Sequence, residues 1–316
     1  MNATLAFPRT GDLHGACSQS TTPVRSADEL RRALRAARAR ALWLDLSGLN
    51  RMLRLDVQRR QIELQAATPW SAVAAYLGEH GVTLDAHAFA DKLAGSVGEA
   101  VSANAPGPDG RPMVSHVEAI TLVTPDGEVR HADRQMNPDL FALAVGGHGL
   151  FGVLYSVTLR IDSLLHAVNR AEAPVVLDLA PPGVECSATH TTEFLVPPEQ
   201  LDPVLASFKA CAAERRIRVQ SVTVRRLQPE DETFLCWAAR EWASVTLRYS
   251  MRRTLGACVH AKEIERLLLD RVLAHGGSFR IGAVQLPELE QLRRCYPRLG
   301  EFMAQKRRYE IGRAHV

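Results

Sequence analysis

The residues from Gly147 to Gly152 spell G-x-G-x-x-G, and their surroundings constrain the fold more than any other feature of the chain. The segment before them, residues 137–143, begins Asn-Pro-Asp and has the apolar spacing of a short helix. The segment after them, residues 153–161, is rich in β-branched residues and predicts a strand. The sequence therefore predicts the order helix, glycine loop, strand.

This order argues against a nicotinamide dehydrogenase. In the dinucleotide-binding motif with the same spelling, the glycines follow a strand and open a helix whose N-terminus holds the pyrophosphate. The residues after Gly152 are too β-branched to form that helix. We therefore interpret the glycines either as a nucleotide site of another kind or as a tight turn between a helix and a strand.

The composition is that of a globular protein. The chain has 316 residues, enough for two ordinary domains, with 46% hydrophobic and 23% charged residues. The net charge is only +3, and no aromatic residues interleave with the arginines of residues 25–40, so we expect no nucleic-acid partner. No apolar run reaches the length of a membrane span, and the 11 histidines lack metal-site spacing, so we expect a cytoplasmic protein without a metal.

Helix and strand signals alternate along the whole chain. In the first half they predict a helix at 27–39, strands at 42–46, 51–57 and 61–66, a helix at 68–79 and a hairpin at 117–132. In the second half they predict strands at 191–196, 218–226, 244–251 and 278–282, helices at 198–214, 230–239 and 257–275, and two C-terminal helices. Because hairpins occur among these elements, the predicted class is α+β in two domains.

Three segments together resemble the FAD-linked oxidase family of the vanillyl-alcohol oxidase/p-cresol methylhydroxylase type. The first reads DLSGLNRML at residues 45–53, the second reads GSVGEAVSANAPG at residues 95–107, and the third runs from NPDLF to GGHGLFGV at residues 137–153. The resemblance implies an α+β fold. A two-part FAD-binding domain would occupy residues 1–165, and an α+β cap or substrate domain would occupy residues 166–309.

The resemblance also implies a cofactor site. FAD would be bound non-covalently, because the histidine to which some relatives attach it is missing. The second and third segments would supply the binding residues, namely Gly95, Ser96, Val97, Gly98, Val101, Ser102, Asn104, Ala105, Gly147, Gly149, Gly152 and Val153. Small residues let backbone amides approach phosphate and ring oxygens closely. Arg308 is the nearest match to a basic residue beside flavin and substrate, and a solvated arginine at a helix end is the alternative.

The chain departs from the family pattern at three places. The first phosphate-binding loop of the family is missing between the predicted helix at 27–39 and the strand at 42–46. Glu99 replaces the second glycine of a Gly-Gly pair, and a carboxylate beside a pyrophosphate is repulsive unless it points away. Residues 310–316 do not follow the family pattern, and we expect them to be a non-native tail.

Two functions follow from the resemblance. One is an FAD-dependent oxidoreductase that oxidises an alcohol, sugar or aldonolactone by hydride transfer to the flavin, with the small-molecule substrate between the two domains. The alternative is a degenerate, non-catalytic relative or a gene fragment that keeps the fold with weak or no FAD binding. The sequence nominates no general base, electron acceptor or oligomeric state.

Overall fold

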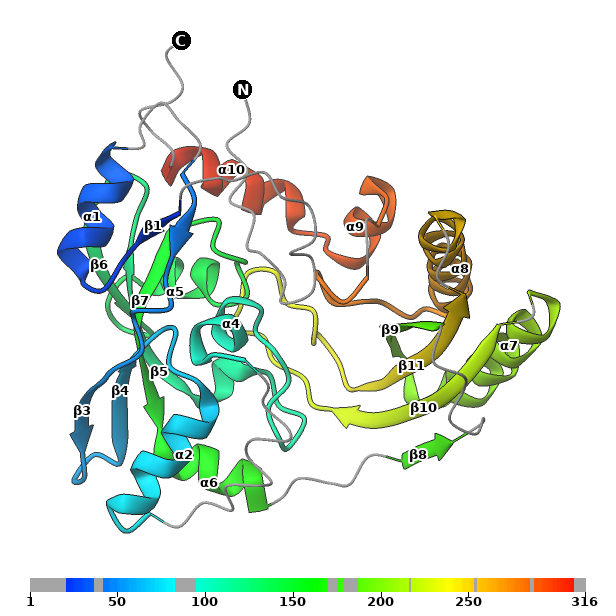
Figure 1. The fold of residues 1–316 in the computed structure, drawn as a ribbon, viewed down its shortest axis with the longest axis horizontal. Coiled ribbons are helices and arrows are strands. Elements are labelled where there is room, and N and C mark those ends of the chain that lie inside the picture. The colour runs from blue at the N-terminus through cyan, green and yellow to red at the C-terminus, as the bar shows by residue number, and fades with distance from the viewer. Residues whose placement is uncertain are drawn as a thin grey trace.

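The structure is a computed structural model that describes residues 21–36, 42–82, 95–169, 175–178, 187–215, 217–252, 255–284 and 287–309. The predicted tail at 310–316 lies outside the described residues. Within them the strands form a parallel pair, a five-stranded sheet and a four-stranded sheet, the latter two antiparallel throughout (Figure 1). This mixture of helices and strands confirms the predicted α+β class.

The parallel pair joins β1 (Thr22–Pro23) to β2 (Leu44–Asp45), with α1 (Ala27–Ala36) between them. The helix begins with an N-terminal cap, in which the Glu29 N–H donates to Ser26 Oγ at 3.2 Å. The Glu29 carboxylate accepts the backbone N–H of Arg25 at 2.7 Å. The position of the missing phosphate loop, at residues 37–41, lies outside the described residues.

The five-stranded sheet belongs to the first half of the chain. Its order is β3 (Met52–Asp56), β4 (Gln61–Gln65), β7 (Val153–Arg160), β5 (Val117–Val123) and β6 (Val129–Asp133). Besides α1, the helices among the described residues of this half are α2 (Trp70–Glu79), α4 (Val97–Ser102), α5 (Pro138–Ala144) and α6 (Ile161–Asn169), with a 3₁₀ turn at Met113–His116. Because α5 precedes the glycines and β7 follows them, the predicted order helix, glycine loop, strand is confirmed.

The four-stranded sheet belongs to the second half. Its order is β8 (Val175–Asp178), β10 (Arg218–Leu227), β11 (Trp242–Arg252) and β9 (Ser187–Val196). Helices α7 (Leu201–Glu214) and α8 (Leu255–Ala274) lie on one side of it, away from the five-stranded sheet, and a 3₁₀ turn at Pro198–Gln200 precedes α7 (Figure 1).

The last helices return to the first half. They are α9 (Leu289–Cys295) and α10 (Leu299–Tyr309). Phe302 of α10 meets the ring of Phe151 edge-on, with 5.0 Å between ring centroids, and Tyr309 meets the same ring at 5.4 Å. Buried apolar residues of both halves consequently form one continuous cluster. The domain boundary near residue 165 remains a prediction.

Several predicted elements are wrong in detail. Residues 230–239 form no helix, because their side chains bond to the first half of the chain instead of continuing a helical pattern. Residues 278–282 form only isolated bridges, such as Ser278 to Leu195, rather than a strand. Helices α4 and α6 and strand β8 are not among the elements predicted from the sequence.

Candidate functional site

Two of the segments predicted to bind FAD lie against each other. The Gly146 N–H donates to the carbonyl of Val101 at 3.0 Å, and the His148 N–H donates to the carbonyl of Ser102 at 2.9 Å. The end of α4 and the start of the glycine loop are therefore held together by backbone hydrogen bonds. This contact joins segments more than 40 residues apart, as the resemblance implies for one site.

The start of α4 is closed by a capping box. Ser96 Oγ accepts the Glu99 N–H at 3.3 Å, and the Glu99 carboxylate accepts the Ser96 N–H at 2.9 Å. The next two amides are also engaged, with Val97 N–H bonded to the Thr68 carbonyl at 3.0 Å and Gly98 N–H bonded to the Ala66 carbonyl at 2.6 Å. The four amides at the described start of α4 are therefore already bonded within the protein, and a diphosphate placed there would lie beside the Glu99 carboxylate.

The glycines of these segments are explained by close packing within the chain. A Cβ on Gly98 would lie 2.7 Å from Ala66 Cβ, and one on Gly147 would lie 2.0 Å from the Leu143 carbonyl oxygen. A Cβ on Gly152 would likewise lie 2.6 Å from the Val123 carbonyl oxygen. Gly95 and Gly149 have φ of +86° and +74°, which glycine adopts without strain.

The predicted cofactor residues fall into two groups. Residues 95–105 and Gly147 lie around α4, whereas Val153, the first residue of β7, packs in a separate small apolar cluster with Val24, Leu30 and Leu49. Val97 and Val101 are fully buried, and Val153 is nearly so. The contacts therefore bring the first group together around α4 and place Val153 against α1.

Asn104 joins the first half of the chain to the second. This residue is fully buried and has φ of +43°. Its side-chain oxygen accepts the Val114 N–H at 2.9 Å, and its Nδ2 donates to Glu230 Oε1 at 3.2 Å. Its backbone carbonyl accepts the indole N–H of Trp237 at 2.9 Å. Both polar ends of the Asn104 side chain are thus used inside the protein.

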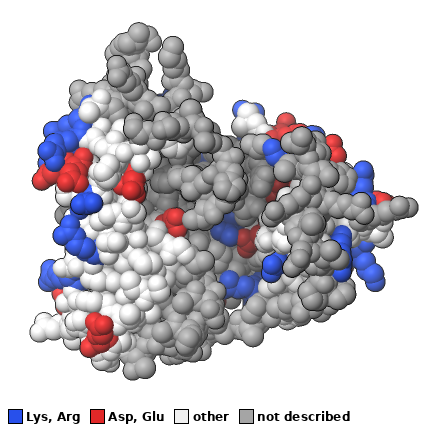
Figure 2. All heavy atoms as spheres, in the orientation of Figure 1, with Lys and Arg blue, Asp and Glu red and all other residues white. Residues whose placement is uncertain are grey.

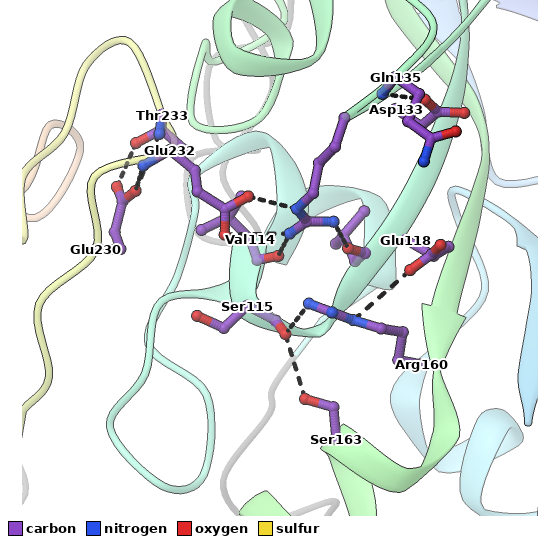
Figure 3. A network of polar contacts seen from close by, with 12 residues as sticks. Val114, Ser115, Glu118, Asp133, Gln135, Arg160, Ser163, Glu230, Glu232 and Thr233 are labelled. Carbon is purple, nitrogen blue, oxygen red and sulfur yellow. Dashed lines mark hydrogen bonds and ion pairs between the residues drawn. The ribbon is translucent and has the colours of Figure 1, made fainter. Parts of the chain in front are cut away.

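Glu230 organises the segment that docks on Asn104. Its carboxylate accepts the backbone N–H groups of Glu232 at 2.7 Å and Thr233 at 2.9 Å, as well as the Thr233 hydroxyl (Figure 3). Arg134 of the first half binds both carboxylate oxygens of Glu232, at 2.5 and 3.2 Å, and also donates to the Val114 carbonyl. Residues 230–237 are therefore fixed to the first half by several polar contacts.

A second polar cluster lies on the side of the four-stranded sheet that faces the first half. Glu193 of β9 forms an ion pair with Arg280, with Arg280 Nε 3.2 Å from Glu193 Oε2, and Ser244 Oγ donates to Glu193 Oε1 at 2.6 Å. Burial raises the pKa of Glu193, but the charge of Arg280 and the bonds from Ser244 and Arg280 outweigh it and hold the pKa below its ordinary value. This carboxylate is therefore ionised at neutral pH.

The same cluster reaches the glycine loop and the loop after Asn104. Burial, with a smaller contribution from the charge of Arg280, lowers the pKa of His148 to about 4, so its imidazole is neutral at pH 7. Arg225 of β10 donates to the carbonyls of Gly107 at 3.0 Å and Pro108 at 3.4 Å. Charged atoms gather between the two halves of the molecule (Figure 2).

Glu193, Arg225 and Arg280 are not among the site residues predicted from the sequence. One signal was available for Glu193, because it is a carboxylate within a run of otherwise buried strand residues. Arg308, by contrast, was nominated, but it is exposed near the end of α10. Its exposure fits the alternative interpretation of Arg308, a solvated arginine at the end of a helix.

The first half of the chain is similar to known proteins. Residues 16–133 match the model of a family described as "FAD binding domain". L-galactono-1,4-lactone dehydrogenase 2 of Oryza sativa subsp. japonica, a mitochondrial protein, is 32% identical over 126 residues, which cover 39% of this chain and 21% of that protein. Cytokinin dehydrogenase 2 of Arabidopsis thaliana is 31% identical over 117 residues, covering 36% of this chain and 22% of that protein.

The whole fold also has a counterpart among solved structures. An alkyldihydroxyacetonephosphate synthase superposes with a TM-score of 0.62 at 9% identity, covering 92% of this chain and 74% of that one. The matched region spans about a fifth of the length of the rice and Arabidopsis relatives. The family-model match and the two relatives confirm that residues in the first half resemble FAD-linked oxidoreductases, and the superposition shows that the fold is shared. No described helix is long and apolar enough to cross a membrane.

Proposed function

We propose that the chain is an FAD-dependent oxidoreductase that oxidises an alcohol, a sugar or an aldonolactone by hydride transfer to the flavin. The FAD binding domain supports the cofactor. The similarity to L-galactono-1,4-lactone dehydrogenase, and to L-gulonolactone oxidase of Bos taurus at 24% identity over 181 residues (51% of this chain and 41% of that protein), supports a hydroxylated substrate.

The observation that carries this proposal is the ion pair between Glu193 and Arg280. Both side chains are largely withdrawn from solvent, with 17% and 18% of their surfaces exposed. Arg280 is also close enough to the glycine loop for its charge to contribute to the lowered pKa of His148. A buried carboxylate and guanidinium offer an acceptor and several donors, which is the complement of a substrate that carries adjacent hydroxyl groups.

Each residue has a distinct role in the proposed site. Arg280 donates to hydroxyl or lactone oxygens, while Glu193 accepts from substrate hydroxyls and holds the guanidinium in place. Arg225 fixes the loop at Gly107 and Pro108 against the sheet, so that the site keeps its shape. The neutral His148 imidazole can accept one hydrogen bond and donate another.

The test is anaerobic reduction of the flavin in protein reconstituted with FAD. L-galactono-1,4-lactone, D-glucose and benzyl alcohol represent aldonolactones, sugars and alcohols, and bleaching of the flavin absorbance reports oxidation. We expect one class to bleach the flavin, and E193Q to lower kcat/KM by about 100-fold because it uncouples the buried pair. The matched control is E128Q, which removes a carboxylate from an exposed pair with Arg35. Absence of bleaching with all three would exclude the proposal.

A second candidate is a relative that keeps the fold with weak or no FAD binding. The capping box at the start of α4 favours it, because the four amides of Ser96 to Glu99 are already bonded within the protein. Cooperative unfolding of a chain that does not respond to FAD would support this candidate. A rise in the unfolding temperature with added FAD would rule it out.

A further inference from the structure

The four-stranded sheet has one apolar face and one polar face. Alternate residues of a strand point to opposite faces, and the apolar set, which includes Phe194, Val245 and Leu247, is buried on the side where α7 and α8 lie. We call the other side the open face. Its polar members in β9, β11 and β10 are Thr191, Glu193, Ser221, Thr223, Arg225, Ser244, Thr246 and Arg248.

The open face is turned toward the first half of the chain. Arg225 on this face donates to the carbonyls of Gly107 and Pro108, which follow α4. Glu193 on the same face pairs with Arg280, whose charge reaches His148 in the glycine loop. The open face therefore continues the proposed substrate site rather than forming a separate surface.

Strand register places the polar residues of the open face in rows. Thr246 of β11 lies opposite Glu193 of β9 and Thr223 of β10, which makes a row with one carboxylate and two hydroxyls. Arg248 lies opposite Thr191 and Ser221, which makes a second row with one guanidinium and two hydroxyls. The rows are two residues apart along each strand, or about 7 Å.

The row of Arg248 has unbalanced positive charge. Its cross-strand partners are both hydroxyl residues, and no ion pair joins Arg248 to any residue in the part of the chain that the structure describes. Glu193 is the carboxylate in the next row, but its two oxygens already accept from Ser244 and Arg280. An exposed guanidinium flanked by two hydroxyls is a donor set suited to an oxyanion.

We propose that Arg248, with Thr191 and Ser221, binds an anionic group of the substrate, about 7 Å along the sheet from the hydroxylated part held by Glu193 and Arg280. The substrate class is then a polyhydroxylated compound with a phosphate or carboxylate at its far end. This inference rests on the proposed function for the identity of the oxidised part, but the anion-binding row can be tested without the cofactor.

The test is calorimetric titration of the full chain with sorbitol, sorbitol 6-phosphate and gluconate. We expect at least one of the two anionic compounds to bind at least tenfold more tightly than sorbitol. A gain in affinity for sorbitol 6-phosphate indicates a phosphate, and a gain for gluconate indicates a carboxylate. R248Q should abolish the gain and leave sorbitol binding unchanged. R226Q is the matched control. Arg226 lies on β10 and is exposed like Arg248, but it forms an ion pair with Glu241.

Equal binding of all three compounds, or binding of none, would overturn the inference. The same holds if R248Q leaves the preference for the anion intact. An anion preference that depends on Arg248 in a chain that fails to bind FAD would instead contradict the proposed function alone. A merely structural role for Arg248 would weaken sorbitol and sorbitol 6-phosphate binding equally.

Discussion

The indole N–H of Trp237 donates a hydrogen bond of 2.9 Å to the backbone carbonyl of Asn104. The bond crosses from the second half of the chain to the turn that ends the α4 segment, and both residues are buried. Because Asn104 also holds Val114 and Glu230, this contact sets how the two halves meet around the candidate site.

Replacing Trp237 with Phe should therefore destabilise the protein. W237F leaves the buried Asn104 carbonyl without its donor and removes part of a packed ring, so we expect a loss of about 2 kcal/mol or more in the free energy of unfolding. Urea denaturation measures the loss. W43F is the control, because no hydrogen bond from the Trp43 indole is found within the described residues. Equal losses for the two variants would contradict this role.

The stability that Glu193 contributes should depend on pH. Its pKa lies below the ordinary value of 4.5 because Arg280 and Ser244 outweigh the effect of burial, so its contribution is present above pH 4.5 and is lost as the pH falls toward the folded value. E193Q should cost about 3 kcal/mol at neutral pH and much less near about pH 3. Denaturation of both proteins across this range checks the sign. A pH-independent difference would refute it.

Glycine at position 147 should be required by packing alone. A Cβ there would meet the Leu143 carbonyl oxygen at 2.0 Å, so G147A should lower the unfolding temperature, at a cost of about 1–3 kcal/mol. Gly78 lies inside α2 with open space around it, and G78A should raise stability by up to about 1 kcal/mol. Thermal unfolding of the two variants should therefore shift in opposite directions. A G147A protein as stable as the parent would contradict the packing explanation.

The charge of Glu99 should weaken FAD binding. Gln at this position keeps the capping box with Ser96 but removes the charge, which opposes a nearby diphosphate by about 1 kcal/mol. We expect E99Q to bind FAD about fivefold more tightly than the parent chain, measured by quenching of flavin fluorescence. E79Q, which removes an exposed charge at the end of α2, should leave the affinity unchanged. Matching affinities for E99Q and the parent would place the diphosphate away from α4.

The order around the glycine loop could be predicted because the signals are local. Asn-Pro-Asp starts α5, and β-branched residues form β7, and neither depends on distant contacts. The capping box at Ser96 and Glu99 was equally local, and its S-x-x-E spacing could have revealed α4. The surrounding glycines and prolines are typical of a loop, and they obscure this helix signal.

The rest of the candidate site depends on pairings distant in sequence. Glu193 and Arg280 are 87 residues apart, and no local pattern indicates that they meet. Residues 230–239 have helical spacing, but Glu230 turns back to cap its own segment and Trp237 bonds to Asn104, so tertiary contacts override the local preference.

Titration of the purified chain with FAD tests the central claim most directly. Binding to a single site should quench flavin fluorescence to saturation at one FAD per chain and raise the unfolding temperature as FAD increases. These results are what an FAD-dependent oxidoreductase requires. No saturable quenching and an unchanged unfolding temperature, even at about 1 mM FAD, would contradict the account and leave a fold that has lost its cofactor.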